Sequence, residues 1–472
     1  MELSRYLSET KPLLVKLIKT LNLQYEYASV LATDSKGKRY TVSKSNISIS
    51  SAMFIERGFV VRVYSSNSYF EYAFNNINEE NFNDIVNEIR NTSKYTKILK
   101  DTDSLRSYEL LNEKKMQFAK CAKVEKDPKD VGDNNIINDM IKIKDEALSI
   151  SDKVVNVGIN FQYVNVNKIF LSPNKDLAQS FMWSESSIFC VTADENGNKQ
   201  MYKGFSGLKG AELLDEMKDC AKYVVGEGVK LLEAKRITPG EYDVICTPDI
   251  TGLIAHEAFG HGVEMDMYVK DRAKSKYYIG KPVASEIVTM VDGAAAAKNN
   301  GSFFFDDEGT EAGETIIIEN GILKSGMSDS LTSLELKKKP TGNGRRQAYD
   351  RKAYTRMTNT FIKPGTDKVD DMIASIKYGV MLDMTFSGME DPKNWGIQCM
   401  MNIGREIKDG KFTGKIFSPV IMTGYVPDLL KSITMISGDF KLAGGGYCGK
   451  GYKEFVKVSD GGPYIKCRAR LG

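Results

Sequence analysis

The chain has 472 residues, of which 42% are hydrophobic and 27% are charged, and its 65 Lys and Arg nearly balance 62 Asp and Glu. This composition is that of a globular protein with room for two or three domains, and it excludes a disordered chain. The formal net charge of +3 gives no electrostatic basis for nucleic acid or an anionic membrane as the main partner.

The N-terminus and the cysteines bear on the compartment. No apolar run approaches the roughly 18–20 residues of a membrane-spanning helix, and charges of both signs interrupt the first apolar patch, so we expect no secretory signal. The seven cysteines are scattered and never spaced CxxC, which argues against a disulfide framework and favours the reducing cytoplasm. The two histidines of the chain, His256 and His261, fall within one six-residue stretch.

The first half of the chain predicts alternating strands and helices from its hydrophobic periodicity. In chain order we expect strands over Tyr25–Thr33 and Arg39–Ile49 with a turn at 34–37, a hairpin of Gly58–Tyr64 and Tyr69–Phe74, a helix from Phe82, a helix over Asn134–Ile150, a half-buried strand over Val155–Tyr163, a hairpin turn at Asn196-Gly197 and a long helix over Ala211–Lys235.

The segment Thr238-Pro239-Gly240 is the predicted domain boundary. It separates an N-terminal α/β domain, residues 1–237, from a β-rich C-terminal domain, residues 238–472, and the fold class is therefore α+β. In the second domain we expect a strand over Tyr242–Cys246, a helix with Pro248 as its first residue, a hairpin around Asn320-Gly321 and an extended, glycine-rich tail from Gly444 onward.

The helix after Pro248 carries His256-Glu257-Ala-Phe-Gly-His261, an HExxxH motif that is one residue longer than the HExxH of many zinc peptidases. In an ideal α-helix the second histidine would lie about 140° around the axis from the first. A π-bulge, or the end of the helix at Gly260, would bring both imidazoles to one side. The spacing therefore predicts a distorted helix here if the two histidines share a metal ion.

A catalytic zinc ion needs a third protein ligand and an open position. The spacing leaves three candidates open: Glu264 and Asp266, close to the histidines, and the distant Cys448 in a glycine-rich segment. The acidic run Asp306-Asp307-Glu308 could hold a second hard metal ion, but we favour a turn with local hydrogen bonds. Lys337–Lys339 is interpreted as a solvated face.

The run from His256 to Asp266 resembles the active-site segment of the TldD/PmbA family of bacterial and archaeal metallopeptidases. Other segments are similar in the same order, and the likeness spans most of the chain. They are Phe305–Thr310, Lys339–Arg346, Arg356–Thr360, Tyr447–Lys450 and, less specifically, Arg57–Phe74.

The resemblance implies that His256, His261 and Cys448 bind one Zn²⁺ per chain and that Glu257 is the general base. It implies the catalytic, TldD-like branch, because the PmbA (TldE)-like branch lacks the HExxxH motif. It also implies a cytoplasmic peptidase that cleaves unfolded peptides or short protein segments in an internal chamber, as a homodimer or as a heterodimer with a TldE/PmbA-like chain.

In such a site, zinc would polarise the scissile carbonyl, and Glu257 would take a proton from the zinc-bound water and pass it to the leaving amine. Arg345, Arg346 and Tyr354 are candidates for stabilising the oxyanion, although an arginine pair is more often a solvated or structural ion-pair element. The alternative is a non-enzymatic interaction or regulatory protein with a structural His-His-Cys zinc site. A nucleic-acid-associated modulator is disfavoured by the near-neutral charge.

Overall fold

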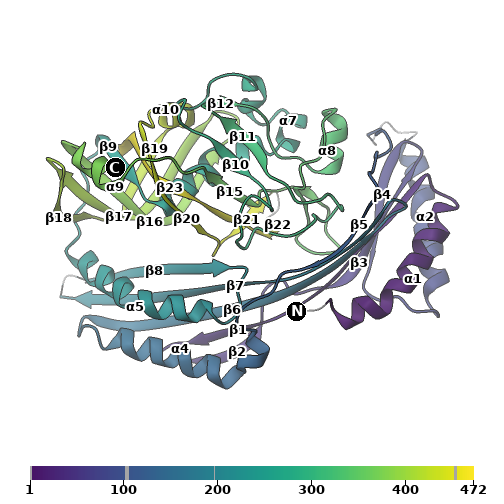
Figure 1. Cartoon of the computed structure of the whole chain (residues 1–472), viewed down its shortest axis with the longest axis horizontal. Helices are drawn as coiled ribbons and strands as arrows, with labels where there is room; N and C mark the ends of the chain where they lie inside the picture. The colour runs from purple at the N-terminus through teal and green to yellow at the C-terminus, as the bar shows by residue number, and fades with distance from the viewer. Residues whose placement is uncertain (1–2, 101–105, 196, 451–453) are drawn as a thin grey trace.

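The structure is a computed structural model that describes residues 3–100, 106–195, 197–450 and 454–472. Two large sheets dominate it, and Figure 1 shows the sheet formed by the first half of the chain lying beneath the body formed by the second half. The mixed α+β class expected from the sequence is confirmed.

The first sheet has eight strands in the described part of the chain, in the order β4-β3-β1-β6-β7-β5, with β2 on β1 and β8 on β7. All neighbours are antiparallel except β5 and β7. The strands are β1 (Tyr27–Val42), β2 (Ile47–Ser51), β3 (Arg57–Ser65), β4 (Ser68–Phe74), β5 (Met116–Cys121), β6 (Val154–Leu171), β7 (Lys175–Asp194) and β8 (Gly197–Gly207).

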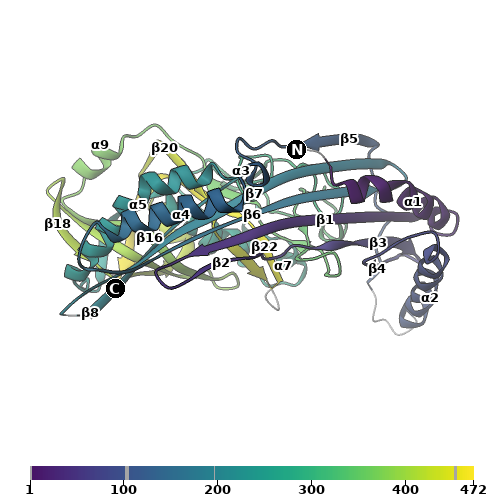
Figure 2. The ribbon, with the colours of Figure 1, turned by 90° about the horizontal axis from the view of Figure 1, so that it is seen from below.

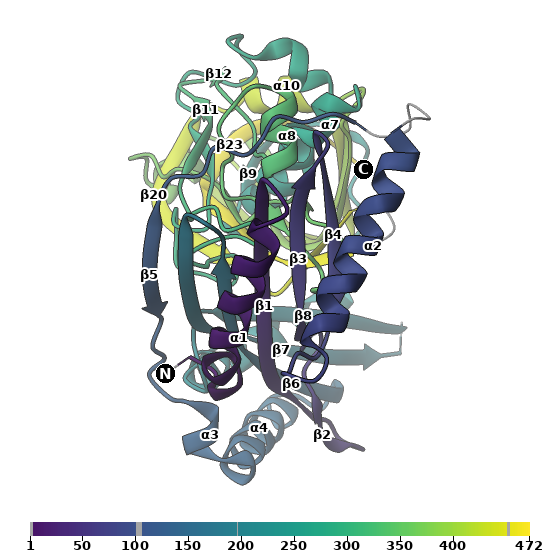
Figure 3. The ribbon, with the colours of Figure 1, turned by 90° about the vertical axis from the view of Figure 1, so that its right-hand side faces the viewer.

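Helices cover the outer face of this sheet in two groups. Figures 2 and 3 show α4 and α5 beneath one end and α1 and α2 against the other. Each group contributes apolar side chains to its own core with the strands above it. The helices are α1 (Arg5–Asn22), α2 (Phe82–Lys100), the short α3 (Pro128–Val131), α4 (Asp133–Leu148) and α5 (Leu213–Lys230), which is followed by the 3₁₀ turn η1 (Leu231–Glu233).

The second sheet has eleven strands among the described residues, in the order β12-β11-β10-β15-β23-β19-β17-β16-β9, with β18 on β17, β20 on β23 and a further pairing of β23 with β9. Its strands are β9 (Gly240–Cys246), β10 (Met290–Asp292), β11 (Thr315–Glu319), β12 (Ile322–Leu323), β15 (Asn359–Ile362), β16 (Tyr378–Asp391), β17 (Gly396–Lys408), β18 (Lys411–Phe417), β19 (Val420–Tyr425), β20 (Met435–Ala443) and β23 (Ser459–Leu471).

Two short hairpins and several short helices complete the second half. The hairpins are β13 (Gly344–Arg345) with β14 (Tyr354–Thr355), and β21 (Tyr447–Lys450) with β22 (Glu454–Lys457). The helices are α6 (Pro248–Leu253), the π-helix η2 (Ile254–Gly260), the 3₁₀ turns η3 (His261–Val263) and η4 (Lys274–Tyr278), α7 (Asp266–Val269), α8 (Ser330–Glu335), α9 (Val369–Ala374) and α10 (Val426–Lys431).

One predicted turn is wrong. Residues 34–37 continue a single strand, β1, which pairs with β6 throughout this stretch. Asp34 is buried and accepts a hydrogen bond from Arg57 Nε at 2.9 Å, so a distant partner satisfies a side chain that would otherwise favour a turn. Gly37 is required by close packing, because a Cβ atom there would lie 2.0 Å from the carbonyl oxygen of Tyr163.

Most other predicted elements of the first half are found, but the single strand predicted over 39–49 is wrong, because β1 ends at Val42 and the chain turns back into β2, which begins at Ile47 and pairs with β1. The predicted helix over 211–235 is shorter, because α5 ends at Lys230 and the chain continues into a 3₁₀ turn. The strands on either side of the predicted 196–197 turn pair as β7 and β8, and Asn196 itself lies outside the described residues. Helix α1, which covers one core, was not predicted.

The sheets are consistent with two domains. Every strand of the first sheet precedes residue 208 and every strand of the second follows residue 239, within the described ranges. The boundary between residues 237 and 238 stays a prediction.

Candidate metal centre

The HExxxH segment lies on a helix that changes its winding. α6 begins at Pro248 and passes at Ile254 into the π-helix η2, and the backbone N–H of His261 donates to the carbonyl oxygen of His256. This bond joins residues five apart, which is the π-helical pattern. The distortion expected from the spacing is therefore present, and it brings the imidazole centroids to 5.2 Å.

Three predicted ligands come together. The donor atoms of His256, His261 and Cys448 all lie within 4.8 Å of one another, and the Cys448 sulfur is 3.5 Å from His261 Nε2. His256 and Cys448 are each only 5% exposed. His256 Nδ1 is buried without a hydrogen-bond partner, and such a nitrogen is costly unless it meets a ligand. This donor set fits a borderline-soft metal ion such as Zn²⁺.

The charges of the three side chains are interdependent. Burial favours the neutral thiol, but the neighbouring His256 and His261 hold the pKa of Cys448 well below its usual value. Burial also acts to lower the pKa of His261, and Cys448 with Glu264 raises it well above its ordinary value. A thiolate is thus favoured at this position, and the thiolate is the form of cysteine that binds metals.

Glu257 faces the same donors. Its carboxylate oxygens lie 3.9 Å from His256 Nε2 and 3.9 Å from His261 Nε2, and its side chain is 29% exposed. Strand β16 passes close by, because a Cβ atom on Gly388 would lie 2.9 Å from Glu257 Cγ. The glycine leaves room for the carboxylate beside the strand.

A cleft of about 770 Å³ opens on this group. It lies between strand β8 of the first sheet and strands β16 and β20 of the second, and the Lys203–Asp249 ion pair, at 2.8 Å, forms part of its wall. Aromatic side chains also line the cleft: Tyr202, Phe205, Phe386, Phe440 and Tyr447.

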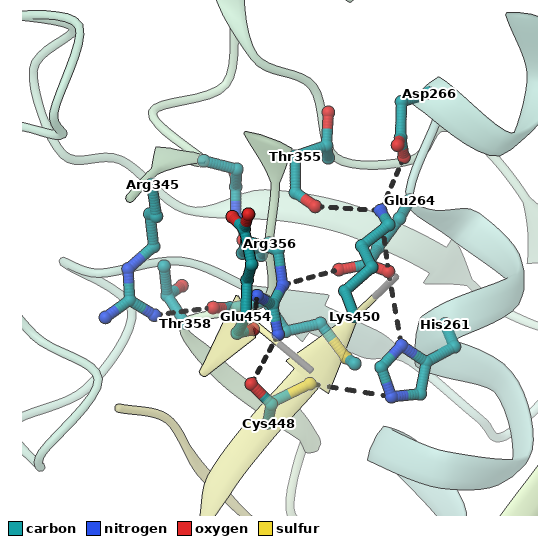
Figure 4. Close-up of polar contacts among 12 residues, drawn as sticks. His261, Glu264, Asp266, Arg345, Thr355, Arg356, Thr358, Cys448, Lys450 and Glu454 are labelled. Atoms are coloured by element: carbon teal, nitrogen blue, oxygen red, sulfur yellow. Dashed lines mark hydrogen bonds and ion pairs between the residues drawn. The ribbon is translucent and has the colours of Figure 1, made fainter. Parts of the chain in front are cut away.

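The two acidic alternatives for the third ligand lie behind the histidines. Glu264 Oε2 is 3.2 Å from His261 Nδ1, the nitrogen that faces away from Cys448, and Asp266 Oδ1 accepts a hydrogen bond from Lys450 Nζ at 2.6 Å (Figure 4). Among the described residues the donor group contains neither carboxylate. A carboxylate on the remaining nitrogen of a ligating histidine is the usual outer partner of a metal site.

Sequence reasoning missed two basic residues beside the site. Lys450 contacts both Glu264 and Asp266, and the Arg356 guanidinium donates to the backbone carbonyl of Cys448 (Figure 4). Two signals in the sequence could have pointed to them. Lys450 lies two residues after Cys448, and Arg356 is the first residue of the segment Arg356–Thr360 that resembles the family.

The oxyanion candidates do not reach the cleft. Arg345 Nη1 donates to the carbonyl oxygen of Met357 at 2.8 Å, Arg346 pairs with Glu71, and Tyr354 lies beside Lys270. None of the three is among the described residues that line the cleft with Glu257.

The acidic run 306–308 forms hydrogen bonds, as favoured. Asp306 Oδ1 accepts from the backbone N–H groups of Glu308 and Thr310, and Asp307 pairs with Lys168. In the described part of the chain these carboxylates form no metal-type cluster. Lys337–Lys339 is exposed, as expected.

No helix among the described residues is both long and apolar enough to cross a membrane.

Several known proteins are similar to this chain in sequence. Residues 239–469 match the model of the PmbA/TldA metallopeptidase C-terminal domain. A metalloprotease of Methanocaldococcus jannaschii is 28% identical over 94% of this chain and 97% of its own length. A metalloprotease of Methanothermobacter thermautotrophicus is 30% identical over 67% and 69%. A zinc metalloprotease TldD homolog of Saccharolobus solfataricus is 29% identical over 70% and 74%.

Two solved structures share the fold. A putative modulator of a DNA gyrase from Thermotoga maritima has a TM-score of 0.77 at 16% identity, over 98% of this chain and 100% of its own. TldE from Thermococcus kodakarensis has a TM-score of 0.76 at 15% identity, over 97% and 99%. At these identities the likeness concerns the fold alone.

Proposed function

The chain belongs to the TldD/PmbA family of metallopeptidases, and from this premise we propose that it is a zinc-dependent peptidase that hydrolyses unfolded peptides or short protein segments. The observation that carries the proposal is the position of Glu257, whose carboxylate lies 3.9 Å from both histidine side chains and on the wall of the cleft.

His256, His261 and Cys448 would hold one zinc ion per chain. Their donor types are those of zinc, and a relative is named a zinc metalloprotease. When bound, zinc acts as a Lewis acid that polarises the scissile carbonyl and makes water more acidic.

Glu257 is the group that would move the proton. Its carboxylate is partly exposed to the cleft and lies beside the three donors, so it can take a proton from the attacking water and deliver it to the leaving amine. Gly388 also lines the cleft, and because it has no side chain the Glu257 side chain can lie against strand β16 at the position where a substrate would bind.

The size of the cleft supports unfolded substrates. A volume of about 770 Å³ accommodates a few residues of extended chain and excludes a folded domain. The alternative, a non-enzymatic protein with a structural zinc, predicts four protein ligands. The described residues supply three donors and a carboxylate on an open cleft, which favours the enzyme.

We also propose a partner and a compartment. The chain would act as a homodimer or with a TldE/PmbA-like chain, which the shared fold with TldE supports, and light scattering of the chain alone and with such a partner tests this. The seven free cysteines support a reducing, cytoplasmic setting.

The substitution Glu257→Gln tests the proposed function. Zinc content should persist, because the three donors are untouched, while cleavage of an unstructured peptide disappears. Glu241→Gln, on the preceding strand at 68% side-chain exposure, is the matched control and should cleave normally. Normal cleavage by Glu257→Gln would show that another group is the base.

A further inference from the structure

The hairpin that carries Cys448 forms no strand pairing with either large sheet among the described residues, although it packs against both of them. Among the described strands, β21 and β22 pair only with each other. No ladder of the second sheet therefore fixes the distance between Cys448 and the HExxxH helix, although the two donors His261 and Cys448 are 187 residues apart in sequence. The hairpin is held by its one-residue link to β23 and by side-chain contacts with the segment that follows the helix.

Lys450, two residues after Cys448, connects the hairpin to the residues that follow the HExxxH motif. Its ammonium group donates to Asp266 Oδ1 at 2.6 Å and to the carbonyl oxygen of Thr355 at 3.0 Å, and it lies 3.1 Å from Glu264 Oε2 (Figure 4). The lysine side chain is only 14% exposed. All three donor positions of the ammonium therefore face buried acceptors.

Glu264 links this lysine to a metal-binding candidate. Its side chain is 1% exposed, and the same oxygen, Oε2, that meets Lys450 also lies 3.2 Å from His261 Nδ1. A buried carboxylate is stable only when it is paired, and the loss of one partner leaves an uncompensated charge. Lys450 and His261 therefore share one carboxylate, which joins the hairpin to the histidine.

Arg356 fixes the hairpin from the other side. Its guanidinium donates to the backbone carbonyls of Cys448, on β21, and of Glu454, on β22. The side chain is 1% exposed, and its Nε lies 3.8 Å from Glu264 Oε1. Glu264 thus lies between two cations that both hold the Cys448 hairpin.

We propose that Lys450 and Glu264 are positioning residues that set the metal affinity of the site, by holding the Cys448 sulfur and the His261 ring at the separation a shared metal ion requires. The inference rests on the proposed function in one respect, namely that these donors bind a metal ion. It assigns neither residue a part in the chemical step. Outer partners of metal ligands typically contribute about 10- to 100-fold to metal affinity.

Cobalt(II) titration of the metal-free full-length protein tests the proposal, because thiolate-to-cobalt absorption reports Cys448 and the ligand-field bands report the geometry of the site. Lys450→Met and Glu264→Gln remove one charge each at similar volume. Each should bind cobalt about 10- to 100-fold more weakly than the unmodified protein, with reduced thiolate absorption. Because the two side chains act as a pair, the double variant should lose no more cobalt affinity than the single variant that binds cobalt more weakly.

Lys270→Met is the matched control. Lys270 also contacts Asp266, at 3.2 Å, but its side chain is 42% exposed and it makes no contact with Glu264 or the hairpin among the described residues. Its cobalt affinity and spectrum should be unchanged. Circular dichroism of each metal-free variant verifies that it folds. If Lys450→Met does not fold, Glu264→Gln still decides the test.

Two outcomes overturn the proposal. Unchanged cobalt affinity and thiolate absorption in both single variants would show that the ion pair is only structural, and multiplied losses in the double variant would show that the two residues act independently. Either result leaves the proposed function intact if the unmodified protein binds cobalt and cleaves peptide. Failure of the unmodified protein to bind cobalt would overturn both.

Discussion

Cys448 distinguishes this site from one built of histidines and carboxylates. The chain has two histidines, and both are in the donor group, so a third imidazole cannot complete it. A thiolate supplies a soft donor and a negative charge, which suits zinc and disfavours the hard cations that carboxylates select.

We predict that Cys448→Ser abolishes peptide cleavage and weakens zinc binding by more than about 100-fold. This loss exceeds the roughly 10- to 100-fold that outer partners of metal ligands contribute. The hydroxyl is a far weaker ligand than the thiolate, and two histidines alone hold zinc poorly. Zinc content after dialysis against a chelator is the measurement. The exposed Cys121→Ser is the control and should retain its zinc. A zinc-replete Cys448→Ser protein would exclude Cys448 as a ligand.

Residue types and spacing could predict much of the site but not its assembly. The pairing of His256 with His261 follows from the motif, while Cys448 was one of three candidates by spacing and was chosen by resemblance. Neither route could show that Glu264 and Asp266 face Lys450, because that contact brings together segments nearly two hundred residues apart.

At the level of elements, the π-helix is what gives the motif its geometry. Its extra residue per turn places His256 and His261 on one side, which a regular helix would not do. Gly260 is closely packed: a Cβ atom there would be 2.4 Å from Met357 Sδ and 2.9 Å from the carbonyl oxygen of Ala255. The surrounding atoms therefore leave no space for a side chain at this position.

We predict that Gly260→Ala destabilises the protein by about 1–3 kcal/mol, the usual effect of overpacking a core, and lowers its zinc content. Gly226→Ala is the matched control, since Gly226 lies in helix α5 with nothing within 4 Å of an added Cβ atom. It should stabilise by about 0.5–1 kcal/mol through helix propensity. Thermal unfolding of both variants is the measurement. If both variants changed the midpoint temperature by the same amount relative to the unmodified protein, the packing argument would be contradicted.

The elements also show where periodicity fails. A helix or hairpin whose partners are close in sequence, such as α4 or β3 with β4, was predictable from its own pattern. Strand β1 was divided into two because Asp34 and Gly37 are turn formers, and only the strands on either side of it and the distant Arg57 show why they extend a strand instead. Long-range pairing overrides local preference here.

On the scale of the whole molecule, a buried ion-pair network joins the two halves. Glu71 on β4 pairs with Arg62 on β3 and with Arg346 from the second half, and Arg62 also pairs with Glu308. Burial alone would raise the pKa of Glu71, but the two arginines lower it to about 2. The ionised carboxylate therefore stabilises the contact between the first sheet and the second half of the chain.

The sign of the resulting pH dependence follows from that lowered pKa. The contribution of Glu71 is complete above its ordinary value of 4.5 and is lost as the pH falls towards about 2. We predict that Glu71→Gln lowers the free energy of unfolding by about 2–3 kcal/mol at pH 7. The difference in this free energy between the variant and the unmodified protein should become smaller as the pH falls from about 4.5 to about 2.

Thermal unfolding midpoints of both proteins as a function of pH are the measurement. Glu79→Gln is the control, because Glu79 is 74% exposed in its pair with Lys16 and such pairs contribute little. A difference between Glu71→Gln and the unmodified protein that does not change with pH would contradict this role of the carboxylate.

The most direct test of the account is an anomalous difference map at the zinc absorption edge from crystals of the purified protein. We predict one peak per chain, about 2.0–2.3 Å from a nitrogen of His256, a nitrogen of His261 and the sulfur of Cys448, with an open position towards Glu257 and the cleft. A peak with a fourth protein ligand in place of that open position, or zinc bound elsewhere, would contradict the assignment of a catalytic centre.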